Sequence, residues 1–115
     1  MSPAPSELRE IAKVVRRDVL TMVLEAGSGH VGGSLSCVDI LVSLYWQVLS
    51  IKPDRPTWED RDRFVLSKAH AAPALYAALA RRGYFDVRDL MTFRKLKSKL
   101  QGTPDPHRKI GRAHV

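Results

Sequence analysis

Apolar residues recur at helical spacing along the first quarter of the chain. Between Ser6 and Gly27 they fall every three or four residues, and charged side chains occupy the opposite face. The pattern predicts an amphipathic helix with Ser6 as its N-cap and Gly27 as a left-handed C-cap. Its predicted inward positions are Leu8, Ile11, Ala12, Val15, Val19, Met22 and Val23.

A second helix is predicted to begin at the tetrapeptide 36–39. Ser36 and Asp39 have the spacing of a capping box, in which each side chain bonds a free backbone amide. From Ile40 to Leu49 the residues are apolar nearly all the way round, which is typical of a buried helix. Its first amides would point back at the preceding residues and favour an anion or a polar ligand there.

A strand, a turn and a helix are predicted next. Segment 61–67 has an apolar centre with polar bounds, which predicts a buried strand of a parallel sheet. Helix 71–82 follows, with Pro73 allowed in its first turn and Gly83 as its cap. His70 would then lie where the strand ends and the helix begins, at the edge where open α/β sheets bind ligands.

The end of the chain is predicted to hold one more helix and then a loop. Helix 86–97 would be opened by Asp86, and its apolar positions again recur at helical spacing. After Leu100 the residues are typical of a loop.

The stretch 27–36 contains four glycines and three serines around His30. It could be a tight helix-to-helix connection, or Gly29, Gly32 and Gly33 could clear space for a molecule that touches His30. The spacing leaves both interpretations open. Although the glycines match G-x-G-x-x-G, a predicted helix precedes them instead of a strand, which argues against a nicotinamide or flavin site.

Composition narrows the class of protein. The 115 residues are 44% hydrophobic and 27% charged, as in ordinary globular domains, and no window has 18 uninterrupted apolar residues. The first residues lack the features of an export signal, so we expect a cytoplasmic protein without membrane contact. The single Cys37 falls in an apolar pattern and is expected to be a structural thiol.

The net charge of +7 is local. Residues 1–93 carry 12 Lys and Arg against 11 Asp and Glu, whereas residues 94–115 carry 7 against 1. A basic tail can bind nucleic acid, but this one has Phe93 as its nearest aromatic and no recognised nucleic-acid motif. We therefore expect a solvated basic face and no nucleic-acid partner.

Three motifs in register resemble the transketolase family. They are Gly-His-Val-Gly-Gly at 29–33, Asp-Arg-Phe-Val-Leu-Ser-Lys at 62–68 and His-Ala-Ala-Pro-Ala-Leu-Tyr at 70–76. Their order and intervals are most similar to the N-terminal subunit of transketolases split into two chains. The resemblance covers residues 6–106.

The resemblance implies an α/β fold that binds thiamine diphosphate, with a parallel sheet sandwiched by helices. Only the helix-rich N-terminal portion of that fold would be present, as an incomplete domain over 1–109. The implied activity is the transfer of two-carbon ketol units between sugar phosphates, in which the cofactor stores a carbanion. The implied alternative is a non-catalytic binding or assembly module of the same fold.

The resemblance also implies roles for individual residues. His30 would be catalytic and would contact the substrate, while Thr103 stands where the family usually has a substrate-binding histidine. A threonine cannot change charge near neutral pH, so handling of the donor sugar is in question. Cofactor contacts are implied for Gly29, Gly32, Gly33 and His70.

Other parts of the implied site are absent from the sequence. The family holds the divalent metal, Mg²⁺ or Ca²⁺, with a later motif, and a C-terminal subunit or domain supplies an essential glutamate. The fragment is therefore expected to be inactive alone and to work as part of a dimer or heterotetramer. Residues 110–115 match nothing in the family and correspond to one frame of a sequencing adapter, so we expect a non-native tail.

Overall fold

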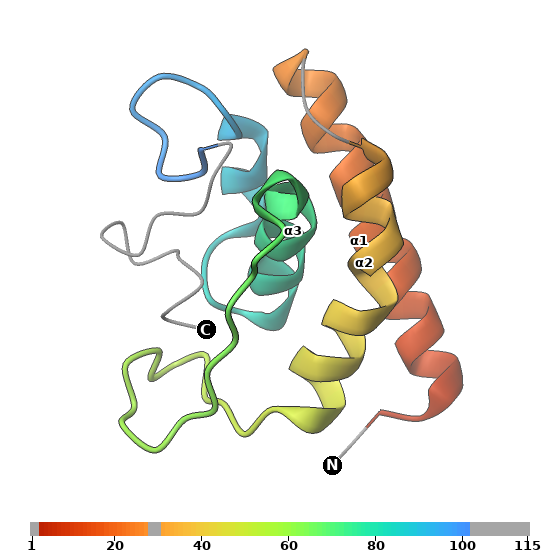
Figure 1. Ribbon diagram of the computed structural model, residues 1–115, viewed down its shortest axis with the longest axis vertical. Coiled ribbons are helices and arrows are strands. Elements are labelled where there is room, and N and C mark those ends of the chain that lie inside the picture. Colours follow the sequence, from red (N-terminus) through yellow and green to blue (C-terminus); the bar gives the residue numbers. More distant parts are fainter. Residues whose placement is uncertain (1–2, 28–30, 102–115) are drawn as a thin grey trace.

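The computed structural model describes residues 3–27 and 31–101. Three α-helices, α1, α2 and α3, form most of the described chain, and they pack against one another (Figure 1). A π-helical turn continues α2, and two 3₁₀ segments flank α3. The bounds are Pro5–Ala26 for α1, Val31–Ser43 for α2, Leu44–Val48 for the π turn, Ala69–Ala71 for the first 3₁₀ turn, Ala72–Arg82 for α3 and Val87–Thr92 for the second 3₁₀ segment.

Helix α1 follows its predicted pattern except at its start. The predicted inward positions are buried or half-buried, and Gly27 caps the helix at a φ of 74°. The prediction of Ser6 as N-cap is wrong, because the helix already begins at Pro5 and Ala4 is the N-cap. Proline suits the first helical position, since its missing N–H would have no partner there.

Helix α2 begins five residues before the predicted cap. The capping-box prediction is wrong, because Ser36 and Asp39 lie inside the helix. The Ser36 hydroxyl donates to the Gly33 carbonyl at 3.0 Å, and Asp39 accepts a hydrogen bond from Arg16 of α1 at 2.7 Å. Packing of α2 against α1 and α3 stabilises the extra turn, which local propensity alone would not favour.

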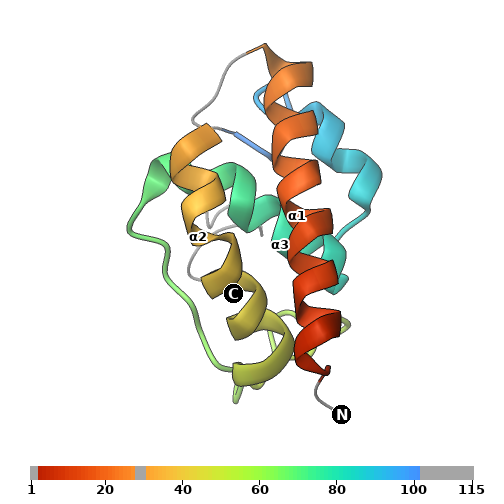
Figure 2. The same ribbon diagram turned by 90° about the vertical axis from the view of Figure 1, so that its right-hand side faces the viewer.

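The fully buried helix is α3 and not α2. Every residue of α3 from Ala72 to Ala80 is buried. By contrast, the side chains of Ile40 and Val48 are 61% and 64% exposed, so the predicted all-round burial of the second helix is wrong for the described chain. The alanines of α3 allow close packing, and α1 and α2 lie along one side of it while the 3₁₀ segment 87–92 packs against it as well (Figure 2).

The stretch 31–48, α2 with its π turn, is long enough and apolar enough to cross a membrane by composition, with a mean hydropathy of 1.3. Core helices of water-soluble proteins pass the same test. Asp39 in its middle is ion-paired with Arg16 of α1, as expected for a helix in a bundle. The absence of membrane contact stays a prediction.

The predicted strand at 61–67 is extended chain without a sheet. Residues 61–68 follow an extended path, and the described residues contain no strand. A parallel strand needs a neighbouring strand for its hydrogen bonds, and the described chain has none to offer. Leu66 is nevertheless buried, while its neighbour Val65 is 62% exposed.

The predicted last helix is only partly formed. Asp86 does cap it, accepting a hydrogen bond from the Arg88 amide at 2.8 Å, but the element is a 3₁₀ segment that ends at Thr92. Arg94 and Lys97 have φ angles of 62° and 66°, which no right-handed helix contains. The α-helix predicted for 86–97 is therefore wrong beyond its cap.

Candidate functional site

The start of α2 lies against the side chain of Lys68. A Cβ atom added to Gly33 would lie 3.4 Å from Lys68 Cε and 3.8 Å from its Nζ, so the lysine crosses directly over this glycine. At Gly32 an added Cβ would meet nothing within 4 Å. The first turn of α2 thus has one covered and one open glycine.

Lys68 is fixed in this position by Ser36. Its Nζ donates to Ser36 Oγ at 2.8 Å, and Ser36 Oγ donates to the Gly33 carbonyl at 3.0 Å. The contact joins residues 32 positions apart and ties segment 61–68 to the start of α2. A cation is thereby held beside helix amides that have no intrahelical partner.

Cys37 neighbours this cation but is a poor nucleophile. Burial raises the pKa of its thiol, and the charge of Lys68 only partly offsets that effect. The thiol donates to the Ser34 carbonyl at 3.3 Å. The geometry agrees with the expected structural role, because a protonated thiol is unreactive.

Ser34 carries a buried hydroxyl in the first turn of α2. Its side chain is fully buried and its Oγ has no hydrogen-bond partner among the described residues. Buried polar atoms are normally paired, so an unpaired one at this position points to a part of the site that the described residues do not supply.

His70 is exposed on the 3₁₀ turn between Lys68 and α3. The turn is closed by the Ala71 amide, which donates to the Lys68 carbonyl at 2.9 Å. Ala72 then begins α3, with Pro73 in its first turn as predicted. His70 therefore stands two residues after the lysine that covers Gly33, and its proposed cofactor contact stays a prediction.

The chain returns to this part of the molecule through Gln101. The buried Tyr76 of α3 donates from its hydroxyl to the Gln101 carbonyl at 2.6 Å, and Leu100 is fully buried. The predicted site residues Gly29, His30 and Thr103 lie outside the described residues. The structure thus brings Gly33 together with Lys68 and leaves the predicted roles of the other three untested.

Such an arrangement suits an anionic group. It combines a fixed ammonium, helix amides that have no intrahelical partner and open space over Gly32. Within 3–27 and 31–101 there is no cluster of three His, Cys, Asp or Glu that could hold a metal ion. The described residues therefore fit a phosphate-bearing cofactor and do not fit a metal by themselves.

Lys68 is the site residue that sequence reasoning missed. It lies within the motif at 62–68 without a predicted role, because its contact with Ser36 depends on the tertiary fold. The available signal was a cation two residues before His70, on a turn expected at the ligand-binding edge of a sheet.

Comparison with known proteins gives the family. The family model described as "Transketolase, thiamine diphosphate binding domain" matches residues 8–112. The 6-deoxy-6-sulfo-D-fructose transketolase subunit SqwG of Clostridium sp. (strain MSTE9) is 43% identical over 111 residues, which are 96% of this chain and 40% of that protein. An apulose-4-phosphate transketolase subunit of Phocaeicola vulgatus is 38% identical over 89 residues, 77% of this chain and 32% of that protein.

Solved structures agree with the sequence relatives. Transketolase from Campylobacter jejuni superposes with a TM-score of 0.83 at 38% identity, over 92% of this chain and 17% of that enzyme. Transketolase from Leishmania mexicana gives a TM-score of 0.82 at 29% identity, over 91% of this chain and 15% of that enzyme.

The chain therefore spans less than half the length of each of these relatives. The described part is the helical N-terminal portion of their thiamine-diphosphate-binding fold, which confirms the expected fold class. With the match running over nearly the whole sequence, this chain belongs to the transketolase family, as part of its thiamine diphosphate binding domain.

Proposed function

We propose that this chain supplies part of the cofactor site of a transketolase that transfers two-carbon ketol units between sugar phosphates. The observation that carries the proposal is the family match over residues 8–112. The anion-binding arrangement at the start of α2, built by Lys68, Ser36 and Gly33, supports it independently.

Three parts of the chain would hold the cofactor. The ammonium of Lys68 and the first amides of α2 are suited to its negative charge, and Gly32 leaves room for its approach. His70 would contact it from the adjoining turn. When bound, thiamine diphosphate stores the carbanion of the two-carbon unit. His30 would hold the substrate and move protons beside it.

The rest of the site would come from elsewhere in the assembled enzyme. Since the described residues contain no metal-binding cluster, ligands for Mg²⁺ or Ca²⁺ would lie outside them. We propose that a C-terminal subunit or domain completes the site in a cytoplasmic dimer or heterotetramer, and that the 115-residue chain alone is inactive. Two relatives are named as subunits, which supports a partner chain.

The experiment is a comparison of variants in the enzyme assembled with its partner. His30→Ala is expected to remove most turnover with folding intact, and Lys68→Gln to weaken thiamine diphosphate binding in a titration calorimeter. Lys13→Gln, an exposed change on α1, is the control and should alter neither. Undiminished turnover in His30→Ala would contradict its catalytic role. Cofactor binding without any ketol transfer would favour the non-catalytic module instead.

A further inference from the structure

A compact basic loop, residues 93–100, projects from the body of the molecule at the upper left of Figure 1. Both of its ends are anchored in the core, since Phe93 is 2% exposed and Leu100 is fully buried. The Arg94 amide donates to the Leu100 carbonyl at 2.8 Å and closes the loop. A hydrogen bond of 2.7 Å between the hydroxyls of Thr92 and Ser98 braces it from within.

Two basic residues of this loop hold an unfavourable backbone conformation. Arg94 and Lys97 have φ angles of 62° and 66°, in the left-handed region that glycine normally occupies. Glycine at these positions would relieve the strain, yet the sequence has arginine and lysine. Strained positions of this kind cluster at ligand-binding sites, so their side chains become candidates for a function.

The loop borders a shallow, open surface hollow of about 520 Å³. Six of its seven lining residues are polar, and three of these are lysines at alternate positions. The lining residues are Asp89, Thr92, Lys95, Leu96, Lys97, Ser98 and Lys99.

Two of the three lysines form ion pairs with carboxylates, and the third forms none within the described chain. Lys95 pairs with Glu25 at 3.3 Å and Lys99 with Asp89 at 3.5 Å. Lys97 has no ion pair with any residue of the described chain. Its charge is therefore uncompensated beside two other cations.

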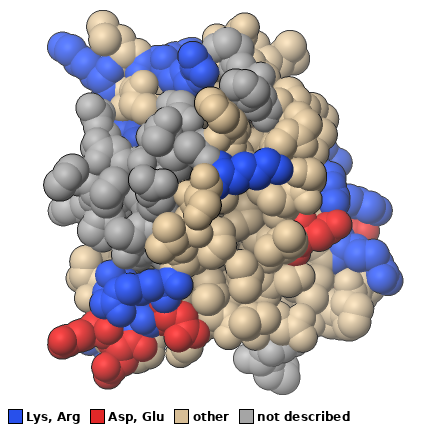
Figure 3. Space-filling view, in the orientation of Figure 1, with Lys and Arg blue, Asp and Glu red and all other residues tan. Residues whose placement is uncertain are grey.

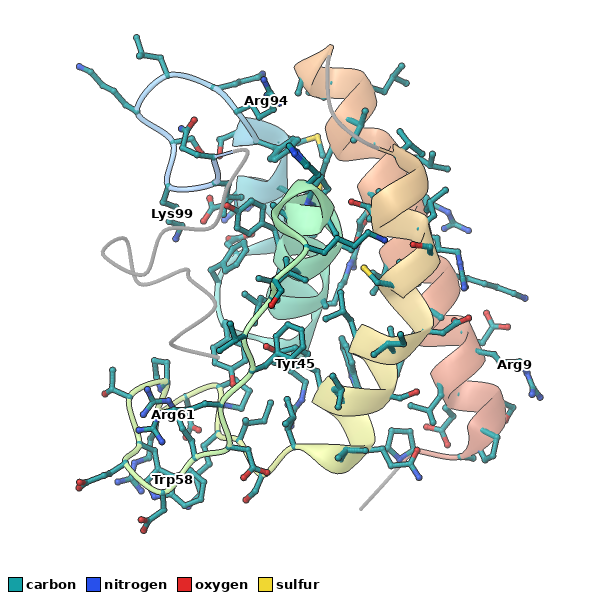
Figure 4. The ribbon with its side chains drawn as sticks, viewed as in Figure 1. Arg9, Tyr45, Trp58, Arg61, Arg94 and Lys99 are labelled. Atoms are coloured by element: carbon teal, nitrogen blue, oxygen red, sulfur yellow. The ribbon has the colours of Figure 1, made fainter. Side chains whose placement is uncertain are left out.

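The surface views show the same concentration of charge. Lys and Arg side chains gather over the loop in Figure 3, and Figure 4 shows Arg94 and Lys99 on opposite sides of it.

We propose that this hollow binds a compact tetrahedral oxyanion, the phosphate or sulfonate group of a small molecule. Lysine ammoniums act as point charges on phosphate, and Lys97 supplies one that no carboxylate of the described chain pairs. The site is separate from the start of α2 and does not rest on the proposed function.

The test is a titration of the chain with inorganic phosphate and with methanesulfonate, at an ionic strength held constant with sodium chloride. Amide NMR shifts of Lys97 and Ser98 report binding. Saturable shifts are expected, and Lys97→Gln should weaken the affinity about five-fold, the factor for one water-screened charge contact. Lys13→Gln on α1 is the matched control and should leave the affinity unchanged.

Lys97→Gly separates binding from stability. The substitution relieves the left-handed strain and removes the charge, so it should raise the melting temperature while it weakens phosphate binding as much as Lys97→Gln does. Shifts that do not saturate, or equal affinities in the parent and both Lys97 variants, would overturn the site. Saturable binding of hexaglutamate without binding of phosphate would assign the loop to an acidic polypeptide and also overturn it.

Discussion

Two buried tyrosines give a test of the core in which the same substitution should have opposite effects. The side chains of Tyr45 and Tyr76 are 1% and 0% exposed. Tyr76 donates to the Gln101 carbonyl at 2.6 Å, whereas the Tyr45 hydroxyl has no hydrogen-bond partner within 3–27 and 31–101. Figure 4 shows Tyr45 between the end of α2 and the chain that follows it. Its ring packs edge-on against Phe64 and Tyr84.

The expected magnitudes follow from this difference. An unpaired buried hydroxyl costs about 1–3 kcal/mol of desolvation, so Tyr45→Phe should raise the free energy of unfolding by about that amount. Tyr76→Phe loses a made hydrogen bond and leaves the Gln101 carbonyl without this donor. It should lower the free energy of unfolding by about 1 kcal/mol.

The assay is urea unfolding followed by circular dichroism at neutral pH. An unchanged m-value in both variants would show that the exposed surface is the same and that the midpoints can be compared. If Tyr45→Phe destabilises the chain as much as Tyr76→Phe does, the Tyr45 hydroxyl is paired, for example with an ordered water, and the reasoning fails.

An alkaline titration gives the same prediction a second readout. Burial, with a smaller effect of Tyr84, raises the pKa of Tyr45 well above its ordinary value near 10. The unfolded chain then loses this proton at a lower pH than the folded chain does, so stability should fall as pH rises above about 10. Tyr45→Phe should make that fall shallower. A fall of the same steepness would show that Tyr45 does not contribute to it.

Three further predictions concern single positions. Hydrogen bonds from Arg88 lower the pKa of Asp86 to about 2, so the stability that the Asp86 carboxylate contributes should be lost as pH falls from about 4 to 2. In Asp86→Ala, the melting temperature should vary less with pH over that range. Arg94→Gly should stabilise the chain by about 1 kcal/mol in urea unfolding, because it removes left-handed strain, and a loss of stability would contradict this. Gly33→Val should push Lys68 off Ser36 and speed its acetylation, measured by mass spectrometry, while Gly33→Ala should not.

The elements that sequence predicted best depend on local chemistry. Gly27 and Gly83 cap their helices at φ angles of 74° and 110°, and Asp86 caps the last 3₁₀ segment. Each follows from a single residue's conformational preference or hydrogen bond. Such signals do not depend on tertiary contacts.

The missed elements depend on partners far away in sequence. Segment 61–67 has the pattern of a strand but finds no neighbouring strand in the described chain. Helix α2 begins at Val31, earlier than predicted, because packing on α1 and α3 outweighs the low helix propensity of its glycines. The helical spacing of apolar residues in 86–97 continues past Thr92, whereas the 3₁₀ segment ends there and Arg94 has a positive φ.

The candidate site divides in the same way. The motifs predicted cofactor contacts for Gly33 and His70, which stay predictions. The contact between Lys68 and Ser36 joins the motif at 62–68 to the stretch 27–36, and neither segment predicts it alone. This contact forms only where segment 61–68 passes the first turn of α2. No periodicity within either segment determines where along α2 that crossing falls.

Helix α3 determines where segment 61–68 lies against α2, because its alanines fix how closely the neighbouring elements pack. Because every side chain from Ala72 to Ala80 is buried, a change of size on any face of α3 would displace α1, α2 or the 3₁₀ segment packed on it. Just before its start stands the turn with His70, and in its middle Tyr76 holds Gln101. At its end Arg82 donates to the Tyr45 carbonyl at 2.8 Å and fixes the π turn that continues α2. An alanine-rich helix without candidate site residues of its own therefore positions the segments that carry the candidate chemistry. Substitutions of its alanines should alter cofactor binding although the alanines do not contact the cofactor.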